Sequence, residues 1–197
     1  MPKGQEFERE LSKQLSLWWT QDLPEPHDAV FWRTSNSGGR ATARQRKGQK
    51  TRGSFGDIGA IDPIGTPLMD LLVIELKRGY NRETIIDVFD CGAKSKRPTY
   101  FSWFTKAEEN KRSSGTFSWV LIHRRDTKSA MIWFPSYLRQ HIKECVFGKF
   151  PTEDTKPVIY VYLNNLCVEG YRLVDFLNQF KPEYFRKLHS KIFPKTA

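Results

Sequence analysis

Asp57, Glu75 and Lys77 place two carboxylates and an ammonium group near the ends of two apolar segments, residues 56–62 (GDIGAID) and 69–77 (MDLLVIELK). The PIGTP segment between them contains the proline and glycine that are typical of a tight turn. If the two segments are the strands of one hairpin, Asp57 lies directly opposite Glu75. Facing residues of an antiparallel pair have Cβ atoms roughly 4.5–5.5 Å apart. We therefore expect two carboxylates to converge at a point where like charges need a cation.

Alternate residues of a strand share a face, so Lys77 is expected beside Glu75, while Leu76 points away and its carbonyl can turn toward the site. Two carboxylates, a carbonyl oxygen and water are hard ligands that suit Mg²⁺, with Mn²⁺ as a substitute, better than zinc. We expect Asp57, Glu75 and the Leu76 carbonyl to bind the ion. The ion would activate a water and stabilise charge on a phosphoryl oxygen, and Lys77 would hold that water. The expected chemistry is phosphodiester hydrolysis.

The ELK triplet alone is weak evidence, because charged residues at this spacing are common on solvated strands and helices. Its position at the end of an apolar strand, with Asp57 at the matching level, favours a site over a surface. Asp62 and Asp70 lie beside the expected turn, where turn chemistry favours aspartate. We give these two residues no catalytic role.

A helix is expected from Gly4 to about Thr20, because four apolar residues recur there at helical spacing. They are Phe7, Leu11, Leu15 and Trp18. At about 100° per residue, Glu8 lies nearer the middle of this stripe than the other acids of the helix. Glu8 is therefore a candidate catalytic residue that could bind the ion through water, or bind a second ion directly. The alternative is a first-turn acid favoured by the helix dipole.

A basic segment accounts for much of the net charge of +10. Its six basic residues lie within a stretch of thirteen that contains no acid: Arg40, Arg44, Arg46, Lys47, Lys50 and Arg52. Cations of this kind favour a polyanionic partner, because neutralised phosphates release counterions. Charge alone does not distinguish DNA from RNA or an acidic membrane. We expect the segment to bind DNA together with Arg33 and Ser37; the alternative is a solvated loop.

The remaining pattern predicts alternating strands and helices. Strands are expected at residues 29–34, 56–62, 69–77, 117–124, 129–134 and 157–163, and helices at 4–20, 82–91 (with Asn81 as N-cap), 100–111, briefly after Pro135 and from Tyr171 onward. The run LLVI (71–74) has no polar alternation, so its strand is expected to be covered on both faces. This order predicts an α/β domain with a mixed central sheet.

Size and composition favour a single folded domain of 197 residues with 39% hydrophobic and 14% aromatic residues. We expect a core over about residues 4–135 and a C-terminal elaboration over 136–197. The sequence has no 18-residue apolar run and no signal-peptide pattern, which predicts a cytoplasmic protein, in a host cell if phage-encoded, without a membrane partner. Cys91, Cys145 and Cys167 lack metal-binding spacing and are expected to be reduced core residues.

Taken together, these residues resemble the PD-(D/E)XK superfamily, and within it most resemble archaeal Holliday-junction resolvases. The matching residues are Gly4 and Glu8 in GQEFEREL, Arg33 with Ser37-Gly38 in WRTSNSGG, Asp57-Ile58 in GDIGA, and Glu75-Leu76-Lys77. The resemblance covers about residues 4–77 and continues loosely to Phe134. It implies a restriction-endonuclease-like core (αβββαβ) with a C-terminal helical elaboration. The chain departs from the superfamily in Gly56, which stands where proline is common, in the basic insertion and in some sixty residues after Pro135.

The expected function is a Mg²⁺-dependent DNA endonuclease with Glu8, Asp57, Glu75 and Lys77 as catalytic residues. Structure-selective or junction-resolving cleavage, as in recombination and repair, is favoured over sequence-specific restriction. Two other hypotheses stay open: a catalytically inactive nucleic-acid-binding protein on the nuclease fold, and an RNA-processing nuclease. The sequence leaves the oligomeric state open, with a homodimer among the alternatives.

Overall fold

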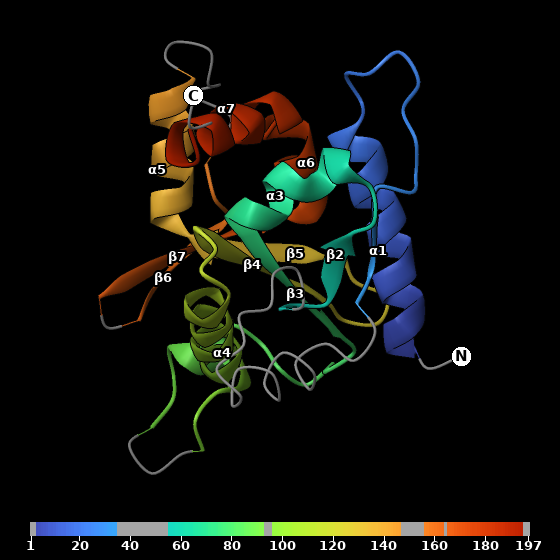
Figure 1. The fold of residues 1–197 in the computed structure, drawn as a ribbon. Helices are drawn as coiled ribbons and strands as arrows, with labels where there is room; N and C mark the ends of the chain where they lie inside the picture. Colours follow the sequence, from blue (N-terminus) through green and yellow to red (C-terminus); the bar gives the residue numbers. More distant parts are fainter. Residues whose placement is uncertain (1–2, 35–54, 93–95, 147–155, 164, 195–197) are drawn as a thin grey trace, which may run out of the picture.

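The computed structural model describes residues 3–34, 55–92, 96–146, 156–163 and 165–194 (Figure 1). Its elements follow the chain in this order: α1 (Lys3–Trp19), β1 (Phe31–Arg33), β2 (Ile58–Ala60), the 3-10 turn η1 (Pro63–Gly65), α3 (Thr66–Leu71), β3 (Leu72–Arg78), the 3-10 turn η2 (Ile86–Val88), α4 (Thr99–Ser114), β4 (Ser118–Arg124), β5 (Met131–Pro135), α5 (Ser136–Cys145), β6 (Ile159–Leu163), β7 (Leu166–Arg172), α6 (Leu173–Gln179) and α7 (Pro182–Ile192).

A five-stranded mixed sheet in the order β3-β4-β5-β7-β6 forms the centre of the molecule. β3 and β4 run parallel, whereas the other neighbouring strands are antiparallel. Helix α4 packs on one face of the sheet, and α1, α3, α5, α6 and α7 pack on the other (Figure 1). The expected α/β arrangement with a mixed central sheet is confirmed.

Strand β3 is covered on both faces, as its unbroken apolar run predicts. Leu72, Ile74 and Leu76 enter the larger core beneath α1, α6 and α7, whereas Val73 packs toward α4. Because side chains alternate along a strand, Glu75 lies on the same face as Val73. The edge strand of the sheet therefore presents its one buried acid to the α4 side.

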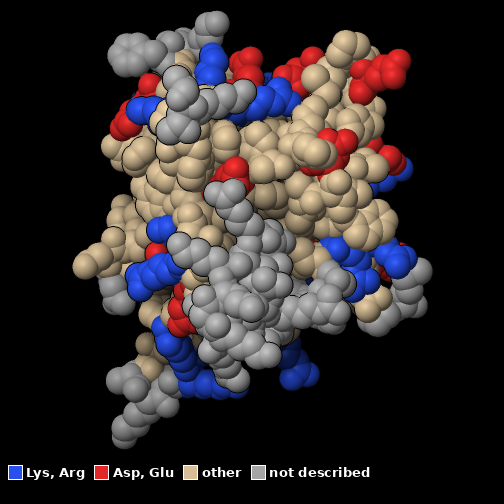
Figure 2. Space-filling view, viewed as in Figure 1, with Lys and Arg blue, Asp and Glu red and all other residues tan. Residues whose placement is uncertain are grey.

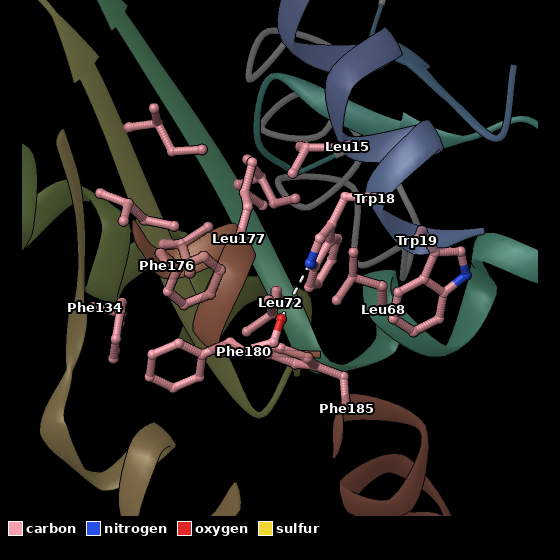
Figure 3. Close-up of a cluster of buried hydrophobic side chains, with 14 of the residues drawn as sticks. Leu15, Trp18, Trp19, Leu68, Leu72, Phe134, Phe176, Leu177, Phe180 and Phe185 are labelled. Atoms are coloured by element: carbon pink, nitrogen blue, oxygen red, sulfur yellow. Dashed lines mark hydrogen bonds between the residues drawn. The ribbon is translucent and has the colours of Figure 1, made fainter. Parts of the chain in front are cut away.

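The C-terminal helices belong to the larger core, where aromatic residues from both ends of the chain meet (Figure 3). The indole Nε1–H of Trp18 in α1 donates to the Phe180 carbonyl at 3.0 Å. Phe176 and Phe180 stack with ring centroids 4.5 Å apart, and the Phe185 ring meets Trp18 edge to face. Each fully buried side chain of this size stabilises the fold by about 1.5–3 kcal/mol. Residues after Pro135 thus help to hold α1 in place.

A second, two-stranded sheet connects α1 to the central sheet. β1 and β2 are antiparallel, with Arg33 paired to Ile58. The Ser16 hydroxyl of α1 accepts hydrogen bonds from the Val30 and Phe31 N–H groups, at 3.1 and 2.9 Å. These bonds fix β1 against the helix that carries Glu8.

The hairpin expected between residues 56–62 and 69–77 is wrong. β2 pairs with β1, and the 3-10 turn and α3 separate it from β3. Asp62 caps the 3-10 turn by accepting from the Ile64 N–H at 2.8 Å. The chain then turns helical with Pro67 in the first turn, and Leu68 and Leu71 bury on one side. The predicted strand residues 69–71 therefore lie in a helix.

The helix expected over residues 82–91 is also wrong, since only the 3-10 turn Ile86–Val88 forms there. The Asp87 carboxylate accepts from the Thr84 N–H at 2.6 Å, a local bond that competes with helix geometry. Strand β7 was missed, and helix begins at Leu173, not at Tyr171.

The other predicted elements are confirmed, with ends shifted by a few residues. They are the helices at 4–20, at 100–111 and after Pro135, and the strands at 29–34, 117–124, 129–134 and 157–163. The cysteines are free but none is fully buried: Cys91 is exposed, and Cys145 and Cys167 are half-buried. The prediction that they are core residues is wrong for Cys91, whereas Cys145 packs against the larger core without being fully buried. None of the described helices is long and apolar enough to cross a membrane.

Candidate active site

Asp57 is held against the outer edge of β3 by backbone hydrogen bonds. Its N–H donates to the Ile74 carbonyl at 2.8 Å, and its Oδ2 accepts from the Leu76 N–H at 2.7 Å. On the opposite side, the Asp57 carbonyl accepts from the Thr34 N–H at 2.9 Å. Asp57 therefore bridges the small sheet and the edge of the large one. The structure brings it beside Glu75 without the expected hairpin.

Gly56 makes this close approach possible. Its φ is +83°, and a Cβ at this position would lie 2.7 Å from the Ile74 carbonyl oxygen. Proline, which is common at this point in the superfamily, has φ fixed near −65° and cannot adopt this conformation. The glycine is thus the residue type that this backbone needs.

Glu75 and Lys77 point from β3 toward α4. Lys77 Nζ lies 3.3 Å from Glu75 Oε2 and 3.9 Å from Asp57 Oδ2. Asn110 of α4 donates from Nδ2 to Glu75 Oε1 at 2.7 Å. One ammonium group is therefore shared by two carboxylates, and both oxygens of Glu75 have a fixed partner.

Burial raises the pKa of Glu75 above its ordinary value, and the negative charge of Asp57 raises it further. Lys77 and Asn110 act in the opposite direction. Glu75 is only 7% exposed, so water does little to stabilise its charge. The site has more carboxylate charge than the protein itself compensates.

The Leu76 side chain packs into the larger core, away from Glu75 and Lys77. Its N–H points to the outer edge of β3, where it meets Asp57. In an extended strand, the carbonyl of a residue points to the same side as its N–H. The Leu76 carbonyl therefore faces the edge on which Asp57 lies.

Glu8 is half-buried on α1 and pairs with Arg33 of β1, with 3.1 Å between Arg33 Nε and Glu8 Oε2. Burial raises the pKa of Glu8, and the charge of Asp57 adds to the rise, while Arg33 and Lys77 lower it. These influences place Glu8 in the electrostatic neighbourhood of the other site residues. Glu6 is exposed, and Glu10 pairs with Arg124 outside the site. The stripe geometry of the helix thus correctly identified Glu8 as the acid nearest the buried side of the helix.

The donors at this edge are two carboxylates and a backbone carbonyl, all hard oxygen ligands that fit Mg²⁺ or Mn²⁺. The buried, incompletely compensated charge of Asp57 and Glu75 also fits a divalent cation. Within the described ranges, no group of three or more His, Cys, Asp and Glu side chains is close enough to hold a metal. Glu8, Asp57 and Glu75 therefore do not form a three-carboxylate ligand group in the described part of the chain.

Most of the predicted DNA-binding residues are not described by the structure, and the two aspartates that were given no catalytic role have other partners. Ser37, Arg40, Arg44, Arg46, Lys47, Lys50 and Arg52 lie outside the described residues. Asp70 pairs with His189, with 3.1 Å between its Oδ2 and the ring Nε2, and Asp62 caps the 3-10 turn. These partners give both aspartates a structural role.

Asn110 was missed by the sequence reasoning. It lies three turns into a helix that was predicted, but nothing in the pattern of α4 marks it as the residue above Glu75. A register for α4 on β3 would have been needed to find it. Since this register depends on long-range packing, local periodicity could not supply it.

A comparison with protein-family models gives a match over residues 2–187, nearly the whole chain, to a family described as "Phage putative PDDEXK endonuclease". A search of curated proteins and a search of solved structures each gave no significant match. The matched region includes Glu8, Asp57, Glu75, Lys77 and the helices that complete the larger core. With its mixed sheet and the carboxylates at the edge of β3, the chain belongs to this PD-(D/E)XK endonuclease family.

Proposed function

We propose that the protein is a Mg²⁺-dependent endonuclease that hydrolyses phosphodiester bonds in DNA. The observation that carries the proposal is the arrangement at the edge of β3: Asp57 bonded to Leu76, Glu75 buried beside it, and Lys77 within ion-pair distance of both carboxylates. Family membership supports nuclease chemistry. The net charge of +10 supports a nucleic-acid substrate.

In this proposal, Asp57, Glu75 and the Leu76 carbonyl hold the ion, and Glu8 contributes through a water molecule. Mg²⁺ supplies stabilisation of the charge on the phosphoryl oxygen and a more acidic water. The Lys77 ammonium orients the attacking water and offsets negative charge that develops on the phosphate. Asn110 holds the Glu75 carboxylate in one orientation. Arg33, fixed by Glu8, lies at the root of the basic segment and contacts the phosphate backbone.

For the substrate, we propose DNA with a branched or otherwise distorted structure, as for the Holliday-junction resolvases that the sequence resembles. We further propose that the protein acts in the cytoplasm, in recombination or repair. Four-way junctions would suit a homodimer, because both are two-fold symmetric. Sequence-specific restriction is the alternative, for which the protein would cut duplex DNA at fixed sites.

The direct test incubates the protein with supercoiled plasmid in Mg²⁺, with an EDTA control. A panel of linear, flapped and four-way DNA, and an RNA of the same sequence, then distinguishes the substrate classes. Preferential cutting of the branched DNA supports the proposal. Binding without cutting in any divalent ion would show an inactive nucleic-acid-binding protein, and a preference for the RNA would show a ribonuclease.

The choice of ion gives a second test. Ca²⁺ is larger and more loosely coordinated than Mg²⁺, so the same oxygens can bind it but position the water poorly. We expect Ca²⁺ to support DNA binding without turnover and Mn²⁺ to replace Mg²⁺, as measured by gel shift and cleavage assays. Strong cleavage in Zn²⁺ alone would contradict a site of hard oxygen donors.

A further inference from the structure

An exposed tyrosine, Tyr80, packs against the half-buried Trp103 just beyond the end of β3. The two ring centroids are 5.0 Å apart with an interplanar angle of 79°. This edge-to-face contact covers at most one face of the Tyr80 ring. The Tyr80 side chain is 53% exposed, although a tyrosine of the fold's core would be buried. We call these two residues the aromatic platform.

The platform lies in line with the carboxylates on the α4 face of β3. Trp103 and Asn110 are seven residues apart on α4, which is about two turns and a rise of about 10 Å. Asn110 contacts Glu75, whereas Trp103 packs on Tyr80, three residues after Lys77. Stacked DNA advances about 3.4 Å per nucleotide along one strand. Along α4, the residue that packs on Tyr80 and the residue that contacts Glu75 are therefore separated by a rise of about three base steps.

A buried hydrogen-bond network holds the platform in place. The Gly79 carbonyl accepts from His123 Nε2 at 2.9 Å, so the other ring nitrogen, Nδ1, accepts from the Tyr100 hydroxyl at 2.7 Å. The Gly79 N–H donates to the Arg124 carbonyl at 3.0 Å. Trp103 packs against the His123 ring, with centroids 5.0 Å apart. The backbone that presents the exposed phenol is thus anchored to β4.

The backbone conformation of Tyr80 costs free energy. Its φ is +52°, in the left-handed region that non-glycine residues rarely adopt. Such strain persists where surrounding contacts enforce it, often at ligand sites. Here Gly79, at φ +83°, precedes it and the network above enforces it. The conformation turns a large aromatic ring toward solvent instead of into the core.

Basic residues lie close to the His123 ring, against which the platform packs. Arg125 and Lys128, in the turn that follows β4, form no ion pair with any residue that the structure describes, and they line a cavity of about 410 Å³ with Tyr100 and His123. Arg82, two residues after Tyr80, is exposed. Figure 2 shows Lys and Arg side chains in the lower half of the molecule, around α4. An exposed aromatic ring can stack on an accessible base of a nucleic-acid strand, and nearby cations can bind its phosphates.

We infer that the aromatic platform stacks on an unpaired nucleobase of the DNA strand that enters the active site. Bases inside a fully paired duplex have no free face to offer, so the platform would favour substrates with unpaired bases close to the cut. Aromatic stacking accepts every base, because each has a π-face, and so it selects structure and not sequence. This inference rests on the proposed function and adds the feature of the substrate that the protein recognises.

The test uses the full-length protein and branched DNA in which 2-aminopurine, a fluorescent adenine analogue quenched by stacking, replaces one base at a time. Emission is measured with Ca²⁺ in place of Mg²⁺, and kcat/KM is measured in Mg²⁺ on branched and fully paired DNA. Tyr80→Phe keeps the ring, Tyr80→Leu removes it, and Tyr162→Leu removes an exposed tyrosine of β6 as a control. Tyr80→Asn replaces the leucine variant if that variant melts early, since asparagine tolerates left-handed backbone.

We expect wild type, Tyr80→Phe and Tyr162→Leu to quench the probe at one position and to prefer branched DNA. In Tyr80→Leu we expect no quenching and a loss of kcat/KM on branched DNA of about 5- to 150-fold, the range for one stacked base. Its kcat/KM on paired DNA should be unchanged. A folded Tyr80→Leu variant that still quenches the probe and discriminates would overturn the inference. If the wild-type protein cuts no DNA, the proposed function is wrong. The fluorescence quenching then shows by itself whether the aromatic platform stacks on an unpaired base.

Discussion

Glu75 is the site residue whose charge is least compatible with its surroundings. It is almost completely buried, its nearest acid is Asp57, and one ammonium serves both. A protein that needed only stability at this position would use an apolar residue or a fully paired charge. A carboxylate kept at such a cost is typical of a functional site.

Neutralising either carboxylate should separate catalysis from binding. We expect Asp57→Asn or Glu75→Gln to abolish cleavage while DNA affinity stays the same or increases, because the change removes a metal ligand and also a negative charge that repels phosphate. Cleavage assays and gel shifts measure the two effects. Asp62→Asn, at a capping residue away from the site, is the control and should cut normally. Wild-type cleavage by Asp57→Asn would refute the assignment.

The raised pKa of Glu75 predicts a pH dependence of stability with a definite sign. In the metal-free protein, the protonated Glu75 carboxyl is tolerated better by the folded state than the charged one. The contribution of Glu75 to stability is therefore fully present below the unfolded-state pKa, about 4.3, and is lost as pH rises through the raised folded-state pKa. Glu75→Gln should therefore gain stability relative to wild type between about pH 4 and neutrality. Urea unfolding in EDTA at several pH values measures the difference.

Glu10 provides a control of opposite sign. The hydrogen bond from Arg124 lowers the pKa of Glu10, so its contribution is present above the unfolded-state pKa and is lost as pH falls. Glu10→Gln should thus lose stability relative to wild type at neutral pH and recover in acid. If both variants shift in the same direction with pH, the environment assigned to Glu75 is wrong.

At the scale of elements, the position of residues Gly56 and Asp57 along the outer edge of β3 determines the geometry of the site. We expect Gly56→Ala to reduce cleavage strongly, by about tenfold or more, because even a 1 Å displacement of a reacting group can cost about 100-fold. The added Cβ would meet the Ile74 carbonyl at 2.7 Å and push Asp57 away. Cleavage rates and thermal melting are measured together.

Gly115→Ala is the matched control for this change. Gly115 also has a positive φ, +73°, but a Cβ there would meet nothing within 4 Å. Both alanines therefore introduce backbone strain, and only Gly56→Ala adds a collision at the site. Equal losses of activity in the two variants would show that strain alone is responsible.

The elements that sequence periodicity could predict are those whose own burial pattern determines them. The stripe of α1 and the apolar run of β3 each encode which side is covered, and both are confirmed. The hairpin expected over residues 56–77 is wrong because β2 pairs with β1. This pairing is determined by the hydrogen bonds of β1 to Ser16 and by packing on α1, and not by the turn. Glu75 and Lys77 share a face by strand alternation, whereas Asn110 depends on how α4 lies across β3, which only tertiary packing decides.

At the scale of the whole molecule, the two ends of the chain have different electrostatic roles. Arg186 of α7 bonds to Asp22 and lies over the Trp19 ring, 4.7 Å from its centroid, so it joins α7 to the end of α1. Lys191 lies 3.9 Å from Glu144. Arg186 and Lys191 thus both have partners within the protein. The segment 40–52 therefore remains the main candidate for phosphate contacts.

The last prediction concerns that segment, which lies outside the described residues, so it rests on the charges of the sequence. Each phosphate contact adds about −0.9 to the slope of log K against log[salt] on duplex DNA. Replacing Arg44, Arg46, Lys47 and Lys50 with alanine should flatten the slope by roughly two to four and weaken binding to every sequence. Fluorescence anisotropy between about 50 and 200 mM salt measures both quantities.

A charge-matched pair of double variants separates a local contact from the general loss of positive charge. Arg44→Ala with Arg46→Ala removes the same charge as Lys187→Ala with Lys191→Ala, at the opposite end of the chain. If the basic segment binds the backbone, only the first pair flattens the slope, by about one to two. Any sequence preference should survive in both, since phosphate contacts position the protein and base contacts specify the site. Equal, small effects of the two pairs would mean that the segment acts only through net charge, and the DNA would then have to follow another surface.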